Sequence, residues 1–299
     1  MLGREDAKTP CFTPGQRITA TLQNVNQDQT VQGRVNGRNV ILSLPQSVKA
    51  GDTLELIVSE VTPKAVFANT AVDRIVPAQA ADAGLDVTVE TYFEWAIESP
   101  PFGSNPPEIP DATWVPDLEP YIERKLFTVN TGHATSAWFG FTAGIEKISD
   151  ALADPAIAAK VEATLEETSA LLEAVHGLDA TELADYRATI LRRFANPALP
   201  DTVERVGRQP LRKLSRNERF VSPAASAAER GLPTAALVAA MGAALAFDVP
   251  SDEQSVELQQ RLRDEDAAAF TTSVTGLDAG HPLSAAVEDV VRARQGELG

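Results

Sequence analysis

The segment DPAIAAKVEATLEETSALLEAVHG, residues 154–177, decides the fold of the larger part of the chain. Asp154 followed by Pro155 is typical of a helix N-cap and first helical residue, and Gly177 is typical of a helix end. Between them, apolar residues recur at helical spacing, namely Ile157, Val161, Leu165 and Leu172. The segment therefore predicts a long helix with one buried face.

The surrounding residues, 113–299, carry the same signals. Asp179 with Glu182 three residues later resembles a capping box. Further helix starts are predicted at Asp201, at Ser251 with Gln254, and at Pro282. The alanine-rich run at 234–247 is shorter than the roughly 20 residues of a spanning helix, and it predicts a buried core helix. Residues 113–299 are therefore expected to form a large all-α C-terminal domain.

The residues before 113 have a different texture. Runs at 18–25, 31–35, 39–45 and 53–61 alternate apolar and polar residues, which predicts short antiparallel strands. The Asn36-Gly37 pair is a hairpin signal between two of them. Residues 1–68 are expected to form a small β-rich module of unknown role. Residues 69–112 add two β-like runs and a proline-rich connector, so the expected fold class is α+β.

Composition limits the function. The 299 residues include 26 basic and 42 acidic side chains, and the formal charge is −16. A protein this acidic is a poor binder of nucleic acid or anionic membranes, so neither is expected as a partner. One cysteine, Cys11, excludes an internal disulfide and fits a reducing cytoplasm. With three histidines and one cysteine, no metal site is expected. The oligomeric state stays open.

The segment YIERKLFTVNTGHATSAWFG, residues 121–140, carries the candidate chemistry. Asn130 and His133 are three apart and share one helix face. Lys125 lies earlier on the same segment, about 12 Å along the axis from His133 if the helix is continuous. One face can then present an ammonium, an amide and an imidazole to one small polar molecule. The alternative is a solvated face with one structural histidine.

These three groups suit alcohol–ketone interconversion. Oxidising a secondary alcohol needs a proton acceptor and donors that hold the developing alkoxide. A lysine accepts that proton when burial or nearby cations, such as Arg124, lower its pKa from about 10.4. Asn130 would donate to the reacting oxygen, and His133 would bind another hydroxyl.

From residue 71 onward the chain resembles the mannitol-1-phosphate 5-dehydrogenases of the polyol-specific long-chain dehydrogenase family. The resemblance rests on the blocks AVDRIVP, VTVETYFEWAIE, ERKLFTVNTGHA, RFANP and DTVERVGRQPLRKLS, which occur in the family's order. It implies NAD-dependent interconversion of mannitol 1-phosphate and fructose 6-phosphate. It also implies that Lys125 is the general acid and base, that Asn130 stabilises the reacting oxygen, and that His133 contacts the substrate.

A basic run supports the phosphate end of such a substrate. Residues 203–219 contain Arg205, Arg208, Arg212, Lys213, Arg216 and Arg219 in an otherwise acidic protein. Arginine side chains match phosphate oxygens bidentately, and a local cationic cluster attracts an anion against the net charge. Arg208, Arg212 and Lys213 are predicted to bind the substrate phosphate. The alternative is a solvated basic face.

The family begins with a dinucleotide-binding domain, and the sequence shows no glycine-rich GxGxxG fingerprint for it. Residues 1–68 are therefore expected to replace that domain, and residues 69–112 to be its residual strands and linker. The cofactor-binding residues are left unassigned, and the dehydrogenase activity is expected to be impaired. The alternative is a non-catalytic sugar-phosphate-binding or interaction protein that retains the helical substrate domain.

Overall fold

The computed structural model describes residues 15–25, 30–35, 38–43, 48–49, 51–58, 67–76, 84–87 and 89–299. The chain divides into two compact units, Met1–Val66 and Phe67–Gly299, and each is considered by itself. Cys11 and the Asn36-Gly37 pair lie outside the described residues. The three-part division at 68 and 112, with the role given to each part, stays a prediction.

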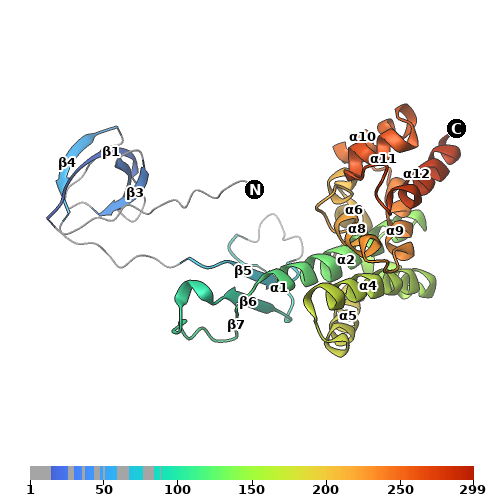
Figure 1. Cartoon of the computed structure of the whole chain (residues 1–299), viewed down its shortest axis with the longest axis horizontal. Coiled ribbons are helices and arrows are strands. Elements are labelled where there is room, and N and C mark those ends of the chain that lie inside the picture. Colours follow the sequence, from blue (N-terminus) through green and yellow to red (C-terminus); the bar gives the residue numbers. More distant parts are fainter. Residues whose placement is uncertain are drawn as a thin grey trace. The chain divides into compact units, whose positions relative to one another are not determined.

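The N-terminal unit contains an antiparallel sheet of four strands (Figure 1). They are β1 (Arg17–Val25), β2 (Thr30–Val35), β3 (Arg38–Ser43) and β4 (Thr53–Ile57), in the order β3-β2-β1-β4. Alternate side chains are buried together on one side, among them Ile18, Ala20, Leu22, Val31 and Val35. The period-two pattern of the sequence is therefore confirmed, because one face of this sheet covers a small core.

A three-stranded sheet opens the second unit, in the order β5-β6-β7. Strand β5 (Thr70–Asp73) pairs antiparallel with β6 (Glu94–Glu98), and β6 pairs parallel with β7 (Thr113–Val115). The proline-rich connector predicted at 99–116 is only partly a loop, since it contains the 3₁₀ turn η1 (Pro100–Phe102) and ends in β7. The three residues between Ala112 and Pro116 are β-branched or aromatic, which favours a short strand in the gap between two prolines.

The rest of the second unit is helical (Figure 1), as the sequence predicts, and the fold class α+β is confirmed. The helices are α1 (Glu119–Arg124), the π turn η2 (Lys125–Asn130), α2 (Thr131–Thr142), α3 (Ile148–Ala153), α4 (Pro155–His176), α5 (Ala180–Phe194), α6 (Val203–Gly207), α7 (Pro210–Lys213), α8 (Val221–Glu229), α9 (Ala235–Leu245), α10 (Glu253–Asp264), α11 (Ala267–Thr275) and α12 (Ser284–Leu298). Within the described residues, no helix combines the length and apolar character needed to cross a membrane.

The predicted helix ends are confirmed where the cap chemistry is strongest. The Asp154 side chain accepts hydrogen bonds from the first amides of α4, and Gly177 ends that helix with a φ of 64°. Asp179 caps α5 in the same way. The other three predicted starts are displaced by one or two residues: Thr202 caps α6, Asp252 caps α10, and α12 begins at Ser284.

Helix α2 is the central element of this unit, because α4, α6 and α9 all pack against it. Trp138 on α2 is fully buried beside Phe220, and its ring N–H donates to the Gly207 carbonyl on α6 at 3.1 Å. Helix α9 is buried along most of its length, as its alanine-rich sequence predicts. The large side chains of the core therefore fix α2 in place, and α2 carries His133 of the candidate site.

A close approach at Gly207 gives a first testable prediction. A Cβ at this position would lie 2.5 Å from the Phe247 ring, well inside van der Waals contact. Gly207→Ala is therefore expected to lower the free energy of unfolding by about 1–3 kcal/mol through overpacking, measured by urea denaturation. The matched control is Gly242→Ala on α9, where the new Cβ would meet Val290 at an ordinary 3.6 Å. A Gly207→Ala protein as stable as this control would contradict the prediction.

Candidate functional site

The KxxxxNxxH segment contains a π turn between α1 and α2. The sequence predicts a continuous α-helix, with Lys125 about two turns before His133. In a π turn the hydrogen bonds run from residue i to i+5, so Lys125 and Asn130 lie about one turn apart. The Thr131 hydroxyl is within hydrogen-bond distance of two carbonyls, Leu126 O inside the π turn and Arg219 O from another segment. The continuous α-helix expected through this motif is therefore interrupted by a π turn.

The structure brings five of the six predicted site residues to one cavity of about 210 Å³. They are Asn130, His133, Arg208, Arg212 and Lys213. Two further arginines of the basic run, Arg205 and Arg219, also line it. The helix α2 face and the α6–α7 segment thus meet at this point, although about 80 residues separate them in the sequence. The roles given to these residues stay predictions.

His133 is held by a carboxylate that the sequence analysis did not assign to the site. Its Nε2 lies 3.2 Å from Asp201 Oδ2, and its ring stacks on Phe194 at 4.6 Å. Asp201 is buried and also pairs with Arg205. Burial alone would raise the pKa of Asp201, but the bonds and charges of His133 and Arg205 lower it. Because Thr202 caps α6, the Asp201 side chain is free to hold the imidazole.

Lys213 is the buried cation of the cavity. Its ammonium donates to the carbonyl oxygens of Val206, at 2.6 Å, and Arg208, and its side chain is almost fully buried. Burial, and then the charges of Arg219 and Arg212, lower the pKa of Lys213 to about 7. An ammonium has three protons, so one stays available for a bound anion.

The two neighbouring guanidinium groups share one carboxylate. Arg212 Nη1 lies 2.7 Å from Glu218 Oε1, and Arg219 Nη2 lies 3.1 Å from Glu218 Oε2. Burial contributes most to lowering the pKa of Arg219. Arg216, from the same basic run, lies near Glu229 and does not line the cavity. Four arginines and one lysine at a single cavity favour a ligand with concentrated negative charge.

Lys125 does not line this cavity. Its Nζ donates to the carbonyl oxygen of Val72 on β5 at 2.5 Å. The neighbouring Arg124 pairs with Glu94, at 2.5 Å, instead of contributing a free cation. The structure thus places Asn130 and His133, two of the three predicted catalytic groups, at the cavity. The third group, Lys125, lies at the other end of the π turn and contacts the sheet.

Two family models match this chain. The mannitol dehydrogenase C-terminal domain matches residues 117–288. The chain belongs to the mannitol dehydrogenase family. The Rossmann domain of the same family matches residues 31–111. The second match removes the support for impaired activity, which was expected because the sequence shows no dinucleotide-binding fingerprint.

Several curated relatives of this mannitol dehydrogenase family member share one name. The mannitol-1-phosphate 5-dehydrogenase of Paenarthrobacter aurescens is 62% identical over 233 residues, which are 78% of this chain and 61% of the relative. That of Aspergillus terreus is 47% identical over 267 residues, covering 85% of this chain and 69% of the relative. The chain therefore spans about three-fifths of the length of the bacterial relative.

A solved structure shares the fold of this family member. Mannitol 2-dehydrogenase of Pseudomonas fluorescens, in a ternary complex with NAD and D-mannitol, aligns with a TM-score of 0.59 and 22% identity. The alignment covers 78% of this chain and 51% of that chain. At this identity the likeness concerns the fold alone.

The geometry of the described residues does not by itself identify a cofactor-binding or metal-binding site. Before Pro116 they form strands and one 3₁₀ turn, with no α-helix whose N-terminus can hold a pyrophosphate. The Rossmann family model that matches 31–111 supports NAD as the cofactor, and part of that range lies outside the described residues. Among all the described residues, no group of three or more His, Cys, Asp or Glu side chains is placed to hold a metal ion.

Proposed function

We propose that this protein interconverts mannitol 1-phosphate and fructose 6-phosphate, with NAD as the hydride carrier. The observation that carries the proposal is the shared cavity of Asn130, His133 and the basic cluster. A polyol phosphate has hydroxyl groups for the first two and a phosphate for the third. The relatives are named mannitol-1-phosphate 5-dehydrogenase, which agrees with mannitol 1-phosphate as one of the two substrates.

Each group in the proposal has a defined task. Arg208, Arg212 and Lys213 bind the phosphate, which places the carbon chain toward α2. Asn130 donates to the reacting oxygen, and His133, oriented by Asp201, binds a neighbouring hydroxyl. Bound NAD supplies the hydride acceptor for alcohol oxidation. Lys125 accepts the hydroxyl proton in that direction and returns a proton to the carbonyl oxygen in reverse.

The alternative of a non-catalytic sugar-phosphate-binding protein is not favoured. Relatives of high identity carry the name of a dehydrogenase, and both halves of that family's domain pair have a match in this chain.

The experiment that tests the proposal has two parts. NADH consumption with fructose 6-phosphate measures turnover, and calorimetric titration with fructose 6-phosphate alone measures binding. The proposal requires both turnover and binding, with fructose giving neither at the same concentrations. Binding without turnover supports the non-catalytic alternative, and a full chain that does neither refutes the proposal.

Removing one guanidinium from the cavity tests the phosphate assignment. Arg212→Gln is expected to weaken fructose 6-phosphate binding by about 10- to 100-fold, since a hydrogen bond to a charged group contributes about 1.5–3 kcal/mol. Arg216→Gln is the matched control, because Arg216 belongs to the same basic run but lies near Glu229. Calorimetry at constant ionic strength measures both. An equal loss for the two variants would show a diffuse charge effect instead of a site.

A further inference from the structure

The Val72 carbonyl that holds Lys125 lies on strand β5, which among the described residues pairs within its sheet only with β6. Val72 itself is opposite Trp95 in that pairing. A strand of four residues with one neighbour has few backbone hydrogen bonds to fix it. The place of the Lys125 amine therefore depends on what else anchors β5.

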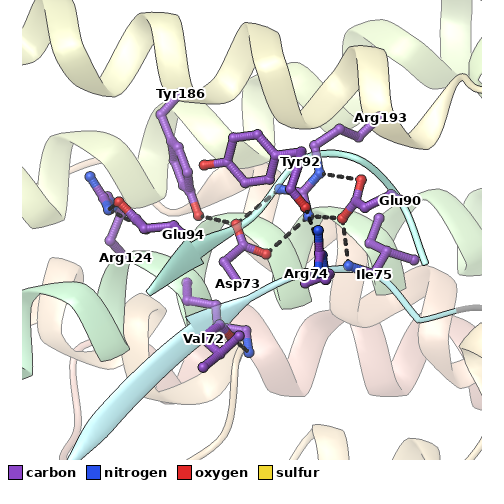
Figure 2. Close-up of polar contacts among 11 residues, drawn as sticks. Val72, Asp73, Arg74, Ile75, Glu90, Tyr92, Glu94, Arg124, Tyr186 and Arg193 are labelled. Carbon is purple, nitrogen blue, oxygen red and sulfur yellow. Dashed lines mark hydrogen bonds and ion pairs between the residues drawn. The ribbon is translucent and has the colours of Figure 1, made fainter. Parts of the chain in front are cut away.

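That anchor is Arg193 on α5, whose guanidinium is buried and binds two carboxylates at once (Figure 2). Its Nη1 and Nη2 donate to Asp73 Oδ2 and Oδ1 at 2.9 and 3.0 Å. Its Nε and Nη2 donate to Glu90 Oε2 and Oε1 at 3.0 and 2.5 Å. Asp73 directly follows Val72, so the guanidinium binds the strand next to the carbonyl that accepts the Lys125 hydrogen bond.

The two carboxylates are themselves held from other sides. The Tyr186 hydroxyl of α5 donates to Asp73 Oδ2 at 2.8 Å, and the amide of Ile75 donates to Glu90 Oε1 at 2.5 Å (Figure 2). Burial and the nearby Asp73 raise the pKa of Tyr186, so its hydroxyl stays protonated. Burial opposes the charge of Arg193, but the bonds to Asp73 and Glu90 raise its pKa. Tyr186 and Arg193 therefore keep their protons across the neutral range.

We propose that Arg193 is a positioning residue, which fixes β5 through Asp73 and Glu90 so that the Val72 carbonyl holds the Lys125 amine. A buried ion pair is weak evidence for a role in stability, because apolar residues of similar size often serve as well. A bidentate guanidinium defines direction as well as distance, which is what positioning a single carbonyl requires. Only the catalytic consequence for Lys125 rests on the proposed function.

The test measures the reactivity of Lys125 in the full chain without any need for turnover. A brief pulse of acetic anhydride, followed by peptide mass spectrometry, gives the modification rate of each lysine as a function of pH. Exposed Lys147 is the internal reference. In Arg193→Met, Lys125 is expected to react about fivefold faster or more, the factor that one hydrogen bond of about 1 kcal/mol provides. Arg193→Lys, which keeps the charge but not the fork, is expected to restore part of the protection.

Two further variants keep the test decisive. Arg261→Met on α10 removes a bidentate pair with Glu265 and is expected to leave Lys125 unchanged. Tyr186→Phe removes a single bond to Asp73 and is expected to raise Lys125 reactivity in the same direction. It serves as the test if the Arg193→Met protein does not fold. Circular dichroism checks the helical content of every variant. A folded Arg193→Met or Tyr186→Phe protein with wild-type Lys125 reactivity overturns the proposal.

This outcome is separable from that of the proposed function. A chain without turnover in which Lys125 still responds to Arg193 would refute the dehydrogenase proposal and keep the positioning role. Where turnover is measured, Arg193→Met is expected to lower kcat about fivefold or more, for the same hydrogen-bond reason, with KM for fructose 6-phosphate unchanged. A rise in KM at constant kcat would instead place Arg193 in substrate binding.

Discussion

Replacing Lys125 with methionine is expected to lower kcat for fructose 6-phosphate by about 10²- to 10⁴-fold, which is the usual contribution of a general acid or base. Methionine keeps the unbranched stem and removes only the amine. Asn130 and the groups proposed to bind the phosphate stay in place, so fructose 6-phosphate is expected to bind within a few-fold of the wild-type affinity. Absorbance of NADH measures the first quantity and calorimetry the second.

The fold is expected to survive this change. Lys125 is only half-buried, and its amine makes one hydrogen bond to a backbone carbonyl. Lys160→Met is a suitable control, because Lys160 lies on α4 against the Phe139 ring and outside the cavity. Global unfolding of the Lys125→Met protein by circular dichroism would assign the lysine a structural role. Undiminished turnover would exclude it as the proton-transferring group.

The helical unit could be predicted because its signals are local. Asp154, Pro155 and Gly177 lie at the ends of the helix they define, and each acts on backbone groups within a few residues. The π turn could not be predicted in the same way. The residues KLFTVN favour an α-helix as readily, and Thr131 bonds a carbonyl from residue 219, far along the chain. Such a contact exists only after the tertiary structure has formed.

The same difference between local and long-range signals applies to the candidate site. The basic run is continuous in sequence, so its arginines and Lys213 can be grouped by their spacing alone. Arg193 and Asp73 are 120 residues apart, and neither has a neighbour in sequence that reveals the pairing. The sequence predicts a helix start at Asp201 because aspartate is common there, whereas Thr202 takes that role and Asp201 holds His133. Long-range polar partners are the part that sequence patterns leave undetermined.

The charge on Lys213 is expected to make anion binding depend on pH, because the pKa of this buried amine is lowered to about 7. The groups that set it are the cations Arg219, Arg212 and Arg208, which lower the pKa further, and Asp252, which raises it. A bound anion favours the ammonium form and raises the pKa in the complex. A proton is therefore taken up on binding above pH 7, and affinity falls as pH rises until the pKa of the complex is reached.

Sulfate is the suitable probe, because it carries two negative charges throughout the neutral range. A phosphate ester instead takes up a proton near pH 6 and then carries one negative charge. The dissociation constant of sulfate is expected to rise about tenfold or more between about pH 6.5 and 9, because one linked proton changes affinity by up to tenfold per pH unit. Lys213→Met is expected to bind sulfate weakly and without this slope, by calorimetry at fixed ionic strength. His133→Asn removes the imidazole of the cavity and is expected to leave the slope intact. If the slope survives in Lys213→Met but disappears in His133→Asn, the pH dependence belongs to the imidazole. Lys213 would then be only a structural donor to the carbonyls of Val206 and Arg208.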